Sequence, residues 1–203
     1  GLDGLAAGIV GIAATAFFVY AFLLSVEFGF DRATLAALIC ALLAGICVGF
    51  LPHNLNPARL FMGDTGSMLI GLLLAASAIT LSGRVDPSAV RGELLLPAIL
   101  PLLLPLAVIA VPLVDVGMAV VRRTRRGRSP FAPDKEHLHH RLIELGHSQR
   151  RAVALMYAWT ALIAFSAVAI ALVPWPVALV VFLAGLAGLA FLVSRPAAAL
   201  SRR

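Results

Sequence analysis

The stretch GLAAGIVGIAATAFFVYAFLL, residues 4–24, decides the fold because it holds no charged side chain. A helix rises about 1.5 Å per residue, so about 20 apolar residues cross the hydrocarbon core of a bilayer. Comparable apolar stretches recur along the chain and give six candidate spans, at about 4–24, 33–51, 65–82, 94–121, 152–173 and 176–194. We therefore expect an all-α protein, a polytopic membrane helix bundle with about six transmembrane helices.

The composition excludes the other large classes of protein. Of the 203 residues, 61% are hydrophobic and 13% are charged, which no ordinary soluble domain or disordered chain shows. Aromatic residues make up only 7%, whereas a membrane β-barrel alternates polar and apolar positions between aromatic girdles. The two cysteines, Cys40 and Cys47, lie in one apolar run. We interpret them as small core residues and not as a disulfide.

The fourth candidate span, 94–121, is too long for one straight crossing and contains Pro97, Pro101, Pro105 and Pro112. Each proline removes a backbone donor and disrupts helical hydrogen bonding, so we expect this helix to be kinked or broken. Two readings stay open here, since the break either opens a groove or is simply tolerated in a membrane helix.

Two glycine pairs predict close contacts between helices. Gly4 with Gly8, and Gly45 with Gly49, both have the small-xxx-small spacing. Small residues at this spacing let helix backbones approach each other in a membrane. Packing is therefore the expected role of all four.

The distribution of basic residues sets the expected topology. The formal net charge is +6, and with Leu55 on the cytoplasmic side every Lys and Arg except Arg32, Arg84 and Arg91 lies on that side too. The positive-inside rule therefore predicts a multi-pass protein whose polar motifs face the cytoplasm, with residues 122–151 as a basic cytoplasmic loop. Basic residues between apolar spans do not indicate nucleic acid, so no nucleic-acid partner is expected.

The segment FMGDTGS, residues 61–67, places Asp64 at the mouth of an apolar helix between two glycines. A carboxylate is a hard oxygen ligand for Mg²⁺, and glycines let a diphosphate approach the backbone. A helix N-terminus also offers free amides to an anion. The alternative is that Asp64 or Thr65 merely caps the helix, and spacing alone does not separate the two readings.

The segment DKEHLHHR, residues 134–141, lies in the basic loop and contains three histidines beside Arg141. These side chains would donate hydrogen bonds to a diphosphate. Zinc binding is the weaker alternative, because only His53 and His147 remain to complete a tetrahedral set. The arginines between 122 and 128 are interpreted as a topology-setting cluster at the anionic leaflet.

Two further acids lie at or inside the membrane. Asp3, in the segment GLDGLA at residues 1–6, stands between glycines at a membrane entry, which indicates a functional position. Asp115 lies near the end of the fourth span, where pairing with Arg122 or Arg123 is favoured over catalysis.

Together these segments resemble the polyprenyl-phosphate N-acetylhexosamine-1-phosphate transferases, a membrane family that includes the phospho-muramoyl-pentapeptide transferase. Residues 61–67, preceded by the pattern Asn54-x-x-Pro57-Ala58, and residues 1–6 carry the most specific part of a resemblance that covers essentially the whole chain. The order His137-x-His139-His140 after Asp134-Lys135 is more similar to the GlcNAc-1-phosphate branch than to the muramoyl branch.

The resemblance implies transfer of a sugar 1-phosphate, foremost GlcNAc-1-phosphate, from a UDP-N-acetylhexosamine to a polyprenyl phosphate, with release of UMP. It places this step of cell-envelope polymer synthesis at the cytoplasmic face of the bacterial plasma membrane. It also implies Mg²⁺, or Mn²⁺ as an alternative, bound by Asp64, with Asp3 as the second catalytic residue. The substrate-binding residues that it implies are Gly1, Leu2, Asn54, Phe61, Gly63, His137, His139, His140 and Arg141.

The chain also departs from the family pattern. It contains no Asp-Asp pair, and the Asn and Asp residues that precede Gly1 in the family motif lie outside it. We therefore expect residues 1–203 to be a single transmembrane domain fragment, the C-terminal half of a longer enzyme that is inactive without its N-terminal helices. A homodimer is left open as a further assembly.

Other functions remain as alternatives. Within the family, the alternative is muramoyl-pentapeptide transfer. From other classes come a transporter, suggested by the broken fourth span and Asp115, and a purely structural scaffold. The transporter predicts that Asp115 and not Asp64 is essential, whereas the scaffold leaves the Asp64 segment unexplained.

Overall fold

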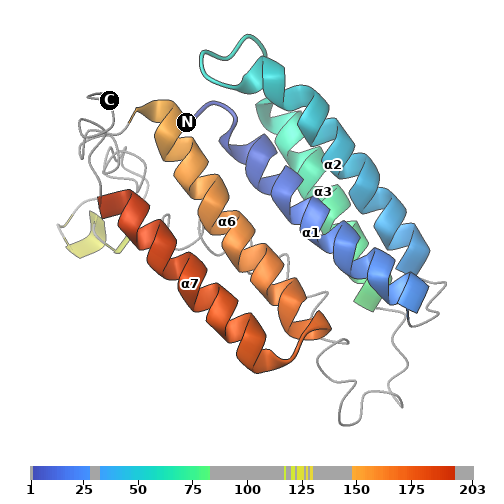
Figure 1. The fold of residues 1–203 in the computed structure, drawn as a ribbon. Helices are drawn as coiled ribbons and strands as arrows, with labels where there is room; N and C mark the ends of the chain where they lie inside the picture. Colours follow the sequence, from blue (N-terminus) through green and yellow to red (C-terminus); the bar gives the residue numbers. More distant parts are fainter. Residues whose placement is uncertain are drawn as a thin grey trace.

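The computed structural model describes residues 2–27, 33–82, 117, 120, 121, 123–125, 127, 129 and 148–194. Within these residues the secondary structure is helical, without a strand. The long helices, drawn in Figure 1, are α1 (Leu5–Glu27), α2 (Thr34–Asn54), α3 (Gly63–Ser82), α6 (Gln149–Leu172) and α7 (Trp175–Ser194). The expected all-α class is confirmed.

All five helices are long and apolar enough to cross a membrane. They fall on the expected first, second, third, fifth and sixth spans, with ends that differ from the expected ones by a few residues. The expected fourth span, 94–121, lies almost wholly outside the described residues, and so does its expected kink. A polytopic membrane bundle is therefore the architecture of the described part.

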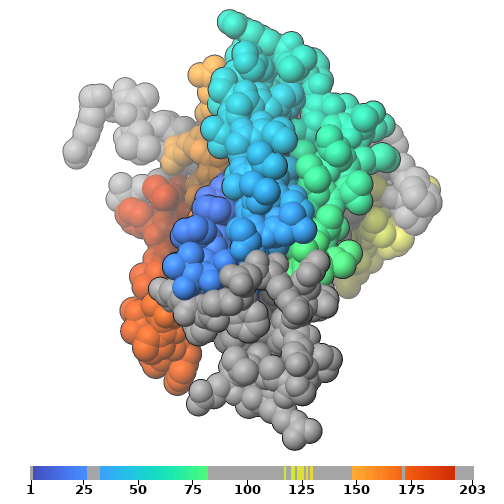
Figure 2. Space-filling model, turned by 90° about the vertical axis from the view of Figure 1, so that its right-hand side faces the viewer, coloured from blue at the N-terminus to red at the C-terminus, as the bar shows by residue number. Residues whose placement is uncertain are grey.

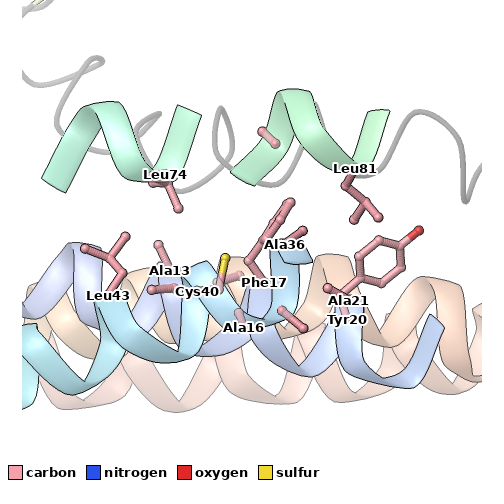
Figure 3. Close-up of a cluster of buried hydrophobic side chains, with 14 of the residues drawn as sticks. Ala13, Ala16, Phe17, Tyr20, Ala21, Ala36, Cys40, Leu43, Leu74 and Leu81 are labelled. Atoms are coloured by element: carbon pink, nitrogen blue, oxygen red, sulfur yellow. The ribbon is translucent and has the colours of Figure 1, made fainter. Parts of the chain in front are cut away.

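Helix α1 lies at the centre and packs against α2, α3 and α6. Its inner face is made mostly of alanines around the fully buried rings of Phe17 and Tyr20. Small side chains suit this position because membrane helices associate through close van der Waals packing and not through a hydrophobic driving force. Figure 3 shows the resulting core, formed by Ala13, Ala16, Phe17, Tyr20 and Ala21 of α1, Ala36, Cys40 and Leu43 of α2, and Leu74 and Leu81 of α3.

Cys40 and Cys47 are both free and buried in this core. Each has the role of a small apolar residue, as the sequence predicts. The expectation that they do not form a disulfide is confirmed.

The outer faces of the helices carry large exposed apolar side chains. Figure 2 shows the face made by α2 and α3. On α2 the exposed side chains of Leu38, Leu42 and Ile46 recur at one-turn spacing. Helix α7 is the least buried of the five helices, with 11% of its most apolar stretch buried. These surfaces suit lipid contact, since a membrane takes the place of the water that would oppose their exposure.

The glycine pairs behave differently from each other. A methyl group at Gly8 would overlap the ring of Tyr157 on α6, so this glycine permits a close approach of the two helices. Gly45 and Gly49 have open space where a methyl group would lie, within the described part of the chain. The packing expectation is therefore confirmed for the first pair, whereas Gly45 and Gly49 contact no other helix among the described residues.

Helix α6 begins with a defined cap. The side chain of Ser148 accepts a hydrogen bond from the backbone amide of Arg151 at 3.3 Å, which satisfies one of the free amides of the first turn. Arg151 in turn donates to the carbonyl of Leu192 at 3.4 Å. This contact joins the start of α6 to the end of α7.

Candidate active site

Three chain segments meet at one end of the bundle. They are the N-terminal turn at residues 2–4, the loop at residues 55–62 that joins α2 to α3, and the first three turns of α6. Figure 1 shows the N-terminus, this loop and the start of α6 at the same end. The polar motifs of residues 1–6 and 54–67 are thus brought together, as expected for one site.

Asn54 holds the N-terminal turn to the α2–α3 loop. Its side-chain oxygen accepts from the backbone amide of Gly4 at 3.0 Å, and its amide nitrogen donates to the carbonyl of Leu60 at 2.8 Å. The side chain is buried, with 8% of the residue exposed. A buried amide that satisfies two backbone groups fixes their relative position, because breaking either bond leaves an unpaired polar group.

Asp3 is held by the same loop. One carboxylate oxygen, Oδ2, accepts from the side-chain amide of Asn56 at 3.1 Å and from the backbone amide of Ala58 at 3.4 Å. Asp3 is half-buried, so its carboxylate lies at the boundary between the bundle and its surroundings. The two donors orient it without neutralising its charge.

Asp64 lies in the first turn of α3, and its side chain is exposed. The helix begins at Gly63, whose φ of 66° is readily adopted only by glycine. Neither Asp64 nor Thr65 makes a side-chain hydrogen bond to a first-turn amide within the described residues, so the capping alternative finds no support there. The first turn of α3 lies at the same end of the bundle as Asp3, because Asn54 joins the N-terminal turn to Leu60 just before α3.

Phe61 lies in the loop directly before α3, with 73% of the residue exposed. A phenyl ring in that position makes little contribution to the core. It leaves an aromatic face available beside Asp64.

Comparison with known proteins assigns these residues to a family. Residues 1–82, which include all of the N-terminal turn and the α2–α3 loop, match the model of glycosyl transferase family 4. The decaprenyl-phosphate N-acetylglucosaminephosphotransferase of Mycolicibacterium smegmatis is 51% identical over 168 residues, which cover 82% of this chain and 41% of that protein. The matched segment, residues 1–82, belongs to glycosyl transferase family 4.

Other relatives of the chain come from both branches expected from the sequence. The probable undecaprenyl-phosphate N-acetylglucosaminyl 1-phosphate transferase of Bacillus subtilis is 32% identical over 77% of this chain and 39% of that protein. The phospho-N-acetylmuramoyl-pentapeptide-transferase of Rubrobacter xylanophilus is 38% identical over 82% of this chain and 43% of that protein. The chain therefore spans about two fifths of the length of these relatives, and the resemblance expected from its motifs is confirmed.

Some of the expected family 4 site residues lie outside the described part of the chain. These are Gly1, His137, His139, His140 and Arg141. Leu2 is half-buried, and its carbonyl accepts from the amide of Leu5 at 3.3 Å, which starts α1. The structure thus places Leu2, Asp3, Asn54, Phe61, Gly63 and Asp64 around one end of the bundle.

The chemistry of these groups fits a magnesium ion shared with a substrate. The described residues contain no group of three His, Cys, Asp or Glu side chains that would hold a metal ion alone. Mg²⁺ commonly binds through one or two protein carboxylates while water and substrate phosphates complete its octahedron. An exposed carboxylate beside helix-end amides, as at Asp64, suits this mode and does not suit tetrahedral zinc.

Three residues that position the site are not predicted from the sequence. Asn56 orients Asp3, while Arg150 and Tyr157 of α6 donate to the loop and to the N-terminal turn. The available indication was the spacing of Arg150 and Tyr157, two polar donors seven residues apart on a largely apolar helix. Their partners lie 94 and 153 residues away in the sequence, so only the packing of α6 reveals them.

Proposed function

We propose that the full-length protein transfers N-acetylglucosamine 1-phosphate from UDP-GlcNAc to a polyprenyl phosphate in the membrane, releasing UMP. The observation that carries this proposal is the convergence of Asp3 and the segment around Asp64 at one end of a membrane bundle. The names of the relatives supply the class of lipid acceptor and the sugar.

The reaction needs positioning and charge stabilisation more than covalent chemistry. A phosphate oxygen of the lipid attacks the β-phosphorus of the nucleotide sugar, and the bond between this phosphorus and the bridging oxygen of UMP breaks. The sugar and its phosphate remain on the lipid as a diphosphate. Mg²⁺, when bound, would neutralise the charge on the diphosphate.

The residues of this chain would divide the remaining tasks. Asp64 would hold the metal ion, and the amides in the first turn of α3 would face the diphosphate. Phe61 would stack on the uracil, and Asp3 would orient the nucleotide end of the substrate. The histidine segment at 137–140 would bind the diphosphate or the sugar.

The test measures Mg²⁺-dependent UMP release from UDP-GlcNAc and polyprenyl phosphate by the full-length protein. We expect activity in the wild type and its loss in Asp64→Asn, with the same yield of folded protein. Glu27→Gln is the matched control, because it removes one negative charge at the far end of α1. Equal activity of wild type and Asp64→Asn would contradict the metal role.

The relative from Rubrobacter xylanophilus gives muramoyl-pentapeptide transfer as the second candidate. The same assay with the UDP-linked muramoyl pentapeptide separates the two branches. Activity with the peptide-bearing nucleotide alone would refute the choice of GlcNAc, and inactivity with both nucleotides would refute the proposed function.

We also propose that the site faces the cytoplasm of a bacterial plasma membrane. Arg59 in the α2–α3 loop and Arg150 and Arg151 at the start of α6 support this orientation, since basic residues favour the cytoplasmic side. In an Arg59→Cys variant, a membrane-impermeant thiol reagent should label position 59 only after the cells are opened. Labelling in intact cells would reverse the orientation.

A further inference from the structure

Helix α6 carries two polar side chains that both donate to main-chain carbonyls of the site. The Nε of Arg150 donates to the carbonyl of Asn56 at 2.9 Å, and the hydroxyl of Tyr157 donates to the carbonyl of Gly4 at 2.5 Å. Residues seven apart lie on the same helix face within about 20°, and about 10 Å apart along the axis. One face of α6 therefore binds both the α2–α3 loop and the N-terminal turn, which are distant from it in sequence.

The two acceptors lie on either side of Asp3. Gly4 follows Asp3 in the chain, while Asn56 donates its side-chain amide to the Asp3 carboxylate at 3.1 Å. Tyr157 thus binds the residue that follows Asp3 in the chain, and Arg150 binds the residue whose side chain donates to the Asp3 carboxylate. Together they fix the N-terminal turn against the loop that leads into Asp64.

The Tyr157 ring is closely packed on one side only. On one side the ring lies directly against Gly8, where even a methyl group would overlap it. On another it borders an apolar cavity of about 220 Å³, which also reaches Gly11, Cys47 and Phe165. Because the cavity leaves this side of the ring unpacked, the hydroxyl bond to Gly4 helps to fix its orientation.

We propose that Tyr157 and Arg150 are positioning residues that set the place of Asp3 relative to the α2–α3 loop. In this role both residues act through the two carbonyls and not through direct contact with substrate or metal. This inference deepens the proposed function and rests on it for its kinetic consequence, because a displaced Asp3 would weaken binding of the nucleotide sugar. Its structural consequence, a looser N-terminal turn and loop, does not depend on the activity.

The first experiment compares the two tyrosines of the chain, each replaced by phenylalanine in the full-length protein. Tyr157→Phe removes the hydroxyl that binds Gly4, whereas Tyr20→Phe makes the same change about 24 Å away along α1. Loss of one hydrogen bond corresponds to about a two- to tenfold effect. We expect the KM for UDP-GlcNAc to rise by that factor in Tyr157→Phe only, with unchanged amounts of folded protein.

A double-mutant cycle with Asp3→Asn shows whether Tyr157 acts through Asp3. If it does, Tyr157→Phe has little further effect on KM once Asp3 is replaced. Effects that multiply independently, or a Tyr157→Phe enzyme that matches Tyr20→Phe in KM, would overturn the positioning role of Tyr157.

Arg150 is tested against its neighbour. Arg150→Ala removes the donor to Asn56, and Arg151→Ala removes an arginine whose guanidinium donates to Leu192 on α7. We expect KM to rise only in Arg150→Ala, and Arg150→Lys to recover part of the loss because it keeps a cationic donor. Equal behaviour of the two alanine variants would overturn the assignment.

Hydrogen exchange gives a readout that is independent of turnover. Exchange at residues 2–8 and 55–62 should become faster in Tyr157→Phe and Arg150→Ala, and should stay at the wild-type rate in the two controls. Unchanged exchange in the site variants would overturn the inference even in an active enzyme. Faster exchange in a protein that is inert with every nucleotide sugar would refute the proposed function and leave the positioning role standing.

Discussion

Replacing Gly8 by alanine tests the close approach of α1 and α6. The added methyl group would overlap the ring of Tyr157, so the ring must move or the helices must separate. Gly45→Ala is the matched control, because it makes the same change within α2 where the surrounding space is open. The two variants have the same change in composition and differ in their surroundings.

The structure gives the expected magnitudes. Alanine favours an exposed helix over glycine by about 1 kcal/mol, so Gly45→Ala should be neutral or stabilising by up to that amount. Overpacking a close contact costs about 1–3 kcal/mol, which cancels or exceeds this gain in Gly8→Ala. Gly8→Ala should therefore be less stable than Gly45→Ala by about 1–3 kcal/mol.

The assay is thermal unfolding of the purified full-length protein in one detergent. The measured quantity is the fraction of protein that remains monodisperse after heating to each temperature. Adding Tyr157→Ala to Gly8→Ala removes the overlapping ring, so the second change should cost less in this background than in the wild type. A Gly8→Ala protein as stable as Gly45→Ala would refute the contact, and with it the explanation of the Tyr157 position.

Three further substitutions test separate features of the site. Asn54→Leu leaves the amide of Gly4 and the carbonyl of Leu60 unpaired, so it should lower stability by about 2–4 kcal/mol in the same thermal assay; an unchanged midpoint would contradict the bridging role. Phe61→Ala should change stability by less than about 0.5 kcal/mol yet raise KM for UDP-GlcNAc about tenfold, and an unchanged KM would argue against stacking on uracil. Gly63→Ala has room for its methyl group but a φ of 66°, so we expect a loss of about 1 kcal/mol; a gain like that of Gly45→Ala would mean that α3 begins differently.

The helices could be predicted from the sequence because lipid imposes one simple requirement on length and polarity. The ends were less certain, since local contacts decide them. The second span was expected to end at residue 51, before Pro52, whereas α2 continues to Asn54. A proline near a helix end forfeits one hydrogen bond, and the buried Asn54 anchors the final residues through bonds to Gly4 and Leu60.

The site could be predicted only where its chemistry is local in sequence. Residues 61–67 alone indicate Asp64 as a site residue, because they place it between glycines at a helix start. Residues 1–6 indicate Asp3 in the same way. The bonds from Arg150 and Tyr157 are not indicated in this way, because they depend on which face of α6 meets α1. Without the structure, Arg150 is one of several basic residues at a membrane boundary, and Tyr157 is one aromatic residue in an apolar span.

The α2–α3 loop is held together mainly through its backbone. The carbonyl of His53 accepts from the amides of Arg59 and Leu60, and Arg150 binds the carbonyl of Asn56. The side chains of Leu55, Arg59 and Leu60 are exposed and take no part in these bonds. Substitution of any of these three side chains should therefore leave the backbone hydrogen bonds of the loop intact.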